Sequence, residues 1–109
     1  MFAEQNLEII MGLIINGGNA KSDEMEAIHA ARKGDFKLAN QKLQVADEFL
    51  INDHYFTNKD AHEKANENDV GITLLTVHSQ DYLMNAILFR DLAGEMVTVY
   101  KKMLQASID

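Results

Sequence analysis

Residues 73–89, TLLTVHSQDYLMNAILF, place one histidine and one aspartate inside an otherwise apolar run. The imidazole of His78 is a competent phosphoryl acceptor near pH 7, because an unprotonated ring nitrogen is nucleophilic. The carboxylate of Asp81 is costly to desolvate unless it is protonated, paired with a cation or bound to a metal. The two side chains are therefore the first candidates for a functional site.

A helix through this run separates the two side chains. On a wheel of about 100° per residue, six apolar residues lie within roughly 60° of Asp81: Leu74, Val77, Met84, Leu88, Leu92 and Val99. A second apolar flank consists of Leu75, Tyr82, Ala86, Phe89, Ala93, Met96 and Tyr100. His78 falls near the seam between the flanks, beside Asn85. Asp81 is thus predicted at the centre of an apolar stripe and His78 at its edge.

The width of this apolar surface predicts an oligomer. Together the flanks span roughly 200° of the helix, more than one neighbouring helix covers. We expect other subunits to cover what the rest of the chain leaves exposed. In a symmetric oligomer Asp81 would recur around the axis, and its copies would repel one another unless a proton or cation lay between them. A hard, oxygen-preferring cation such as Mg²⁺ is the natural candidate.

Ordinary structural roles compete with these interpretations. A histidine on an apolar flank is more often a satisfied core or interface residue, and Asp81 could form a buried ion pair with a lysine or arginine. A Ser-His-Asp triad is disfavoured, because the adjacent side chains of Ser79 and His78 diverge on a helix. Gln80 lies on another side of the helix, so it could act directly in the reaction at His78 only where a neighbouring subunit meets it. The remaining histidines are interpreted as surface or structural residues: His29, His54 and His62.

Length and composition limit the possible functions. The chain has 109 residues, 47% of them hydrophobic, which predicts a single domain over residues 1–109. It contains no proline, which favours long helices, and no cysteine, which excludes disulfides, thiolate zinc sites and cysteine nucleophiles. A net charge of −7 argues against nucleic acid or anionic lipid as a partner and permits a basic protein surface. The apolar run 9–15 is too short to span a membrane and lacks a preceding basic segment, so we expect a cytoplasmic protein without membrane insertion.

Two connectors divide the chain into helices at about 3–33, 36–66 and 73–104, which predicts an all-α, antiparallel three-helix bundle. In the first connector, RKGDF, Gly34 can end one helix in the left-handed conformation and Asp35 can cap the next. The second, NENDVGIT at 66–73, offers Asp69 or Thr73 as a cap.

Apolar residues also have helical spacing in the first and second predicted helices. In the first, this spacing links Leu7, Ile10, Met11, Ile14, Met25 and Ile28. The pattern stays in phase across Gly17 and Gly18, so we expect one continuous helix with a close-packing glycine patch. In the second it links Phe36, Ala39, Leu43, Ala46, Phe49 and Leu50.

The run VHSQDYLMNAILFRDLA resembles the phosphoacceptor region of the lactose/cellobiose-type IIA component of the bacterial phosphoenolpyruvate-dependent sugar phosphotransferase system. Its core is the pattern His-x-Gln-Asp-x-Leu-Met, which begins here at His78. The resemblance extends to GNAKS at 18–22 and AARKGDF at 30–36, and to the spacing of Ala46, Leu50 and His54. It therefore covers nearly the whole chain in the same order. Tyr82 departs from the pattern, since family members often have a second histidine there.

This resemblance implies a specific role. Members of this family look like three-helix subunits that assemble into a homotrimer, a nine-helix bundle. By the resemblance, His78 accepts phosphate from phospho-HPr on Nε2 and passes it to a IIB component, which serves a membrane IIC component during uptake of a lactose/cellobiose-type sugar. Gln80 is a candidate supporting residue. The Asp81 side chains meet at the trimer axis and share one divalent cation, for which we expect Mg²⁺.

Two other functions use the same features. A non-catalytic trimeric helical adaptor would use Asp81 to set its oligomeric state, but gives His78 no role. A histidine phosphotransfer domain of two-component signalling would also carry a reactive histidine on a bundle. The lysine and glycine that this second family has soon after its histidine are missing from SQDYLMN, which follows His78 here.

Overall fold

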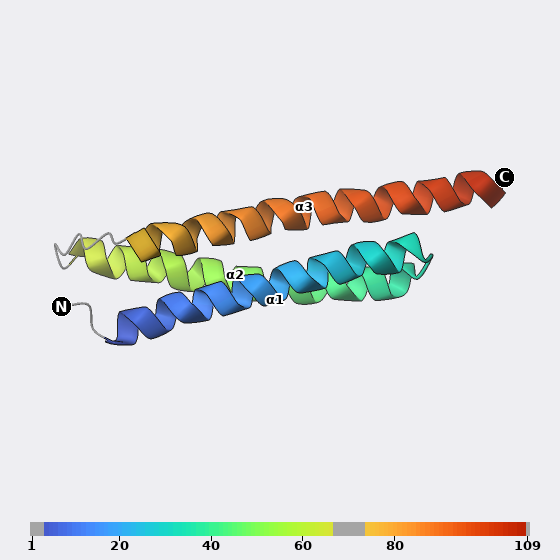
Figure 1. The fold of residues 1–109 in the computed structure, drawn as a ribbon. Helices are drawn as coiled ribbons and strands as arrows, with labels where there is room; N and C mark the ends of the chain where they lie inside the picture. Colours follow the sequence, from blue (N-terminus) through green and yellow to red (C-terminus); the bar gives the residue numbers. More distant parts are fainter. Residues whose placement is uncertain (1–3, 67–73, 109) are drawn as a thin grey trace.

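The computed structural model describes residues 4–66 and 74–108, and the side-chain environments of residues 7–51 and 74–106. Three helices account for all of this: α1 Glu4–Arg32, α2 Phe36–Asn66 and α3 Leu74–Ile108. Successive helices run in opposite directions, as Figure 1 shows, so the described chain is the predicted all-α antiparallel bundle. It is a thin rod of 63 × 19 × 18 Å. A rod of this shape has much surface for its volume and leaves many apolar side chains uncovered.

The turn between α1 and α2 forms as its sequence predicts. Gly34 has a φ of 88°, the left-handed conformation that glycine adopts without a Cβ clash. Its N–H donates to the Ala31 carbonyl at 3.0 Å, and the N–H of Asp35 donates to the Ala30 carbonyl at 2.9 Å, which together close α1 in a Schellman motif. The Asp35 carboxylate then accepts a hydrogen bond from the Leu38 N–H at 3.1 Å and caps α2.

Helix α1 passes Gly17 and Gly18 without a break, as predicted. Gly17 is buried, and a Cβ added to Gly18 would lie 3.3 Å from the hydroxyl oxygen of Tyr82 on α3. The missing side chain at Gly18 therefore leaves room for the Tyr82 hydroxyl of α3 beside α1.

The core consists mainly of alanine, with a few larger side chains. Its two clusters are Ala27, Ala30, Ala31, Ala39, Leu43, Ala93 and Val97, and Ala20, Ala46, Leu50, Leu83 and Ala86. The predicted α2 positions from Ala39 to Leu50 lie in or against these clusters. In α1 the residues with helical spacing do not all face inward: Ile10 is buried, but Leu7, Met11 and Met25 are exposed. Alanines occupy the seam instead, because small side chains let the helices approach closely.

The remaining features of the fold are the C-terminal end of α3 and the connector between α2 and α3. Helix α3 extends beyond the α1–α2 turn and ends at Ile108, later than the expected Leu104, because neither glycine nor proline follows Leu104 to stop it. Residues 67–73, with the candidate caps Asp69 and Thr73, lie outside the described residues. None of the described helices is long and apolar enough to cross a membrane.

Candidate functional site

His78 lies one turn into α3 and is exposed. Its neighbour Ser79 is 3% exposed, and its hydroxyl donates a hydrogen bond to the Thr76 carbonyl of the same helix at 2.8 Å. Successive side chains on a helix are about 100° apart, so an inward Ser79 turns His78 outward. This hydrogen bond satisfies the buried hydroxyl of the serine, and the small side chain leaves room for close helix packing.

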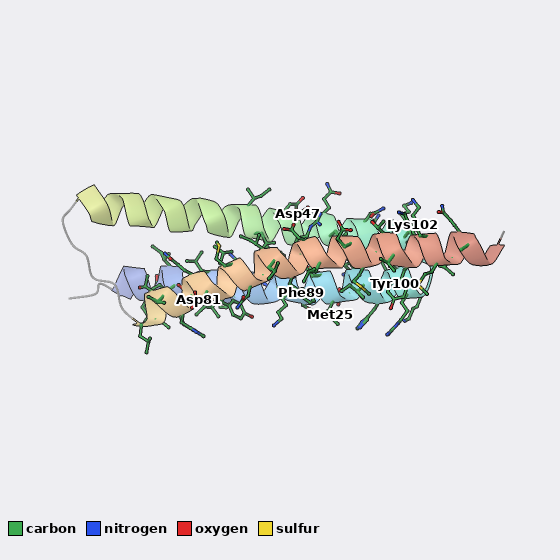
Figure 2. All side chains as sticks on the ribbon, turned by 90° about the horizontal axis from the view of Figure 1, so that it is seen from above. Met25, Asp47, Asp81, Phe89, Tyr100 and Lys102 are labelled. Carbon is green, nitrogen blue, oxygen red and sulfur yellow. The ribbon has the colours of Figure 1, made fainter. Side chains whose placement is uncertain are left out.

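Asp81 lies on the outward face of α3, near its N-terminal end (Figure 2). The apolar residues predicted to surround it are all exposed in the single chain: Leu74, Val77, Met84, Leu88, Leu92 and Val99. Leu88 and Leu92 are still 58% and 54% exposed, although they lie in the middle of the helix. Helices α1 and α2 therefore leave this stripe uncovered. We call it the Asp81 stripe.

The second flank of α3 faces the other two helices. Ala86 and Ala93 are buried, and Tyr82, Phe89 and Tyr100 are half-buried. Leu75 and Met96, at the margin, remain 36% and 38% exposed. One chain thus uses one flank of α3 for its own core and presents the other, with Asp81, to its surroundings.

The remaining candidate residues lie apart from His78 around the helix or along the chain. Gln80 is exposed on α3, and His29 is exposed near the end of α1. The side chains of His54 and His62 lie outside the described ones. Asn85 is exposed, as expected for a residue at the seam beside His78. His78 is therefore the one histidine that the described structure places beside the Asp81 stripe.

The neighbours of Asp81 bear on how its charge is compensated. Among the described residues, no lysine or arginine forms an ion pair with Asp81, so the buried ion pair considered above has no support within one chain. Those residues also contain no group of three His, Asp or Glu side chains that could hold a metal ion. One chain offers a single carboxylate at the centre of an apolar surface. That donor fits a cation only if further copies of the chain contribute theirs.

A second charged group was not predicted and reaches from the core, where Glu24 is buried, to the surface, where the Asp47 side chain is 41% exposed. It joins all three helices through Glu24 of α1, Asp47 of α2 and Arg90 of α3. Arg90 donates two hydrogen bonds to Asp47, from Nε at 2.6 Å and from Nη2 at 3.0 Å. Arg90 follows His78 by twelve residues, or about 18 Å along a helix, so this group is not part of the His78 site.

The charge state of Glu24 in this group follows from its burial. Glu24 is 0% exposed, and desolvation raises the pKa of its carboxyl from 4.5 to about 7, against the opposing effect of Arg90. The hydrogen bond to Asp47 raises the pKa of Arg90, which therefore remains a cation. The sequence carried a signal for this group: Glu24 is in phase with Ala20 and Ala27 on the core face of α1.

Comparison with known proteins agrees with the geometry. Residues 8–101 match the family model of the PTS system, lactose/cellobiose-specific IIA subunit. The lichenan-specific phosphotransferase enzyme IIA component of Bacillus subtilis is 40% identical over 102 residues, which cover 94% of this chain and 93% of that protein.

Solved structures of two relatives share the fold. The crystal structure of the cellobiose-specific enzyme IIA from Bacillus anthracis superimposes with a TM-score of 0.85 at 36% identity, covering 96% of this chain and 94% of that one. The IIA(chitobiose)–HPr complex of Escherichia coli contains a chain with a TM-score of 0.81 at 33% identity, covering 88% and 93%. The chain described here belongs to the lactose/cellobiose-specific IIA family of the sugar phosphotransferase system.

Proposed function

We propose that the chain is a cytoplasmic phosphocarrier that accepts a phosphoryl group from phospho-HPr on His78 and passes it to a IIB component. The observation that carries this proposal is the exposed imidazole of His78 at the edge of the Asp81 stripe. A relative solved in complex with HPr supports HPr as the donor. Relatives named for lichenan and cellobiose support uptake of a cellobiose-type sugar through the IIB and membrane IIC components.

The transfer needs little from the carrier beyond an accessible nitrogen. Nε2 is the ring nitrogen further from the backbone, so it is the one that a partner protein reaches first. Its electron pair attacks the phosphorus, and the pair of the breaking P–N bond returns to the imidazole of the donor. One phosphoramidate replaces another, so the reaction asks mainly for in-line positioning and charge stabilisation. The net charge of −7 attracts a basic partner surface.

The proposed working form is a homotrimer. Three copies that pack their Asp81 stripes together would bury apolar surface that one rod of three helices leaves exposed, and would form a nine-helix bundle. His78 lies at the edge of the stripe, so it would remain near a subunit boundary where a partner has access. The same geometry would bring Gln80 of a neighbouring subunit into reach of the bound partner, which is the supporting role proposed for it.

One divalent cation per trimer, which we propose to be Mg²⁺, would be held by the three Asp81 carboxylates. Its chemistry there is charge neutralisation: it offsets the repulsion of three like charges inside an apolar interface. The fit rests on the donor type, the central place of Asp81 in its stripe and the absence of a paired cation among the described residues.

A phosphotransfer assay tests the acceptor. The protein is incubated with phosphoenolpyruvate, enzyme I and HPr, and acid-labile phosphate is measured with and without HPr. We expect HPr-dependent label in the wild type and in His29→Ala, the matched control with another exposed histidine, and none in His78→Ala. Label retained in His78→Ala would refute the assignment. No label in any variant would favour the non-catalytic adaptor.

Asp81→Leu tests the shared cation separately. Sedimentation measures the oligomeric state, and elemental analysis of the gel-filtered protein measures bound metal. We expect the leucine variant to form a trimer that holds no divalent cation and does not dissociate in chelator. Metal content unchanged by the substitution would contradict an axial Asp81 site.

A further inference from the structure

The group of Glu24, Asp47 and Arg90 lies between the two clusters of the core. On α1, Glu24 lies between Ala20 of one cluster and Ala27 of the other; on α3, Arg90 lies between Ala86 and Ala93 in the same way. Asp47 of α2 accompanies Ala46 and approaches Arg90 from that helix. Among the described residues, these three side chains form a polar layer between two apolar clusters. We call Glu24, Asp47 and Arg90 the polar layer.

Glu24 is the anomalous member of this layer. Its side chain is fully buried, and neither carboxylate oxygen has a hydrogen-bond partner among the described residues. The charges around it come from all three helices: Lys21 and Asp23 on α1, Asp47 on α2 and Arg90 on α3. Two of its nearest charged neighbours are carboxylates, which disfavour a further negative charge.

Arg90 gives Glu24 no hydrogen bond in the observed arrangement, although its positive charge lowers the pKa of Glu24. Its Nε and Nη2 groups both donate to Asp47. Its Nη1 lies over Gly94, where an added Cβ would come within 2.8 Å of it. The guanidinium is therefore held between Asp47 and the α3 backbone. An ionised Glu24 beside it would be a buried carboxylate without hydrogen bonds, which is a costly state, whereas a neutral carboxyl fits.

We propose that Glu24 is a proton-binding site of the bundle: its neutral form belongs to the observed arrangement, and loss of the proton draws Arg90 from Asp47 on α2 toward Glu24 on α1. The N–H groups of Arg90 would then donate to carboxylates on both α1 and α2 instead of to Asp47 of α2 alone. Proton binding at Glu24 therefore controls how firmly α2 is tied to α3. This inference does not depend on the phosphocarrier role of His78.

The direction of the pH effect follows from the pKa. An unfolded Glu24 loses its proton near pH 4.5, whereas the folded chain retains it up to about pH 7. Between these values the folded state binds more protons, so a rise in pH lowers stability there and has no further effect well above pH 7. A shift of this size corresponds to an unfolding equilibrium constant that rises roughly 10²-fold across the window.

Carbon-13 NMR of the wild-type side-chain carboxyls tests the site directly. We expect the Glu24 signal, assigned in the wild type through its connectivity to the backbone resonances, to titrate with a midpoint of 6 or higher. The Nε proton of Arg90 should shift with the same midpoint in the wild type and stay fixed in Glu24→Gln. A Glu24 midpoint below 6 would overturn the proton site. An Arg90 signal that does not move in the wild type would overturn the exchange of partners.

Unfolding in urea provides the second measurement. Glu24→Gln should flatten the fall in stability between pH 5 and pH 8, whereas the matched variant Glu48→Gln, which removes an exposed carboxylate of α2, should retain it. Equal pH dependence in the wild type and Glu24→Gln would contradict the proposal. The carboxyl titration uses the wild-type chain and decides the question even if Glu24→Gln folds poorly.

Discussion

Leu88 provides the sharpest test of the proposed assembly, because it lies in the middle of the Asp81 stripe and is 58% exposed in one chain. Full burial of a leucine side chain stabilises by about 1.5–3 kcal/mol, so covering this exposed fraction contributes about 1–2 kcal/mol per subunit. Three subunits give about 3–5 kcal/mol per trimer. Since about 1.4 kcal/mol corresponds to a factor of ten, Leu88→Gln should lower the association constant by roughly two to four orders of magnitude.

Sedimentation equilibrium over a range of protein concentrations measures this constant. The matched control is Leu38→Gln on α2, which replaces a 39% exposed leucine that lies outside the stripe. We expect Leu38→Gln to leave the association constant unchanged. Asp81→Leu should act in the opposite direction to Leu88→Gln, because it removes the repelling charges from the same surface.

Three results would contradict this reasoning. A monomeric wild type would show that the Asp81 stripe is not a contact between copies of the chain. Equal losses in Leu88→Gln and Leu38→Gln would place the contact on another surface. An Asp81→Leu variant that associates more weakly than the wild type in chelator would mean that the carboxylate makes a favourable contact rather than an unfavourable one.

Further substitutions test the fold and the polar layer. Asp35→Ala should lower the free energy of unfolding by about 1 kcal/mol, because it removes the cap on the Leu38 N–H, and Asp35→Ser should restore most of it in urea titrations. Leu83→Ala should cost about 2–5 kcal/mol in the same assay, since Leu83 is 1% exposed and its loss leaves a cavity. Arg90→Met should move the carboxyl NMR midpoint of Glu24 upward, because Arg90 is the largest influence that lowers the pKa of Glu24.

Local rules predicted the features that depend on a few adjacent residues. Gly34 and Asp35 form the turn that their types favour, since a left-handed glycine and a capping carboxylate act within one turn of helix. Continuity through Gly17 and Gly18 was also predictable, because the apolar spacing stays in phase across them. These predictions needed no knowledge of what lies beside the helix.

The packing partners of each face were harder to predict. The wheel found two apolar flanks on α3, but only the structure shows that the chain covers the flank with Ala86 and Ala93 and leaves the Asp81 stripe exposed. The helical spacing of Met11 and Met25 predicted the helix but not its buried face, because the α1 seam is lined by alanine and both methionines are exposed. Glu24 was also not predicted to be buried, because a charged residue at a core position does not fit an apolar helical pattern.

The orientation of α3 couples His78, the proposed acceptor, to the proposed assembly. With Ser79 facing the core, Asp81 lies about 160° away and points outward, whereas His78 lies about 100° from Ser79 and about 60° from Asp81. Rotating the helix to bring Asp81 inward would bury a charge, and rotating it the other way would expose the alanine flank. The core and the carboxylate therefore fix the rotation of the helix together. His78 is held at the edge of the Asp81 stripe as a consequence. In the proposed trimer, that position would let a neighbouring subunit line its surroundings and would leave it accessible to the proposed donor.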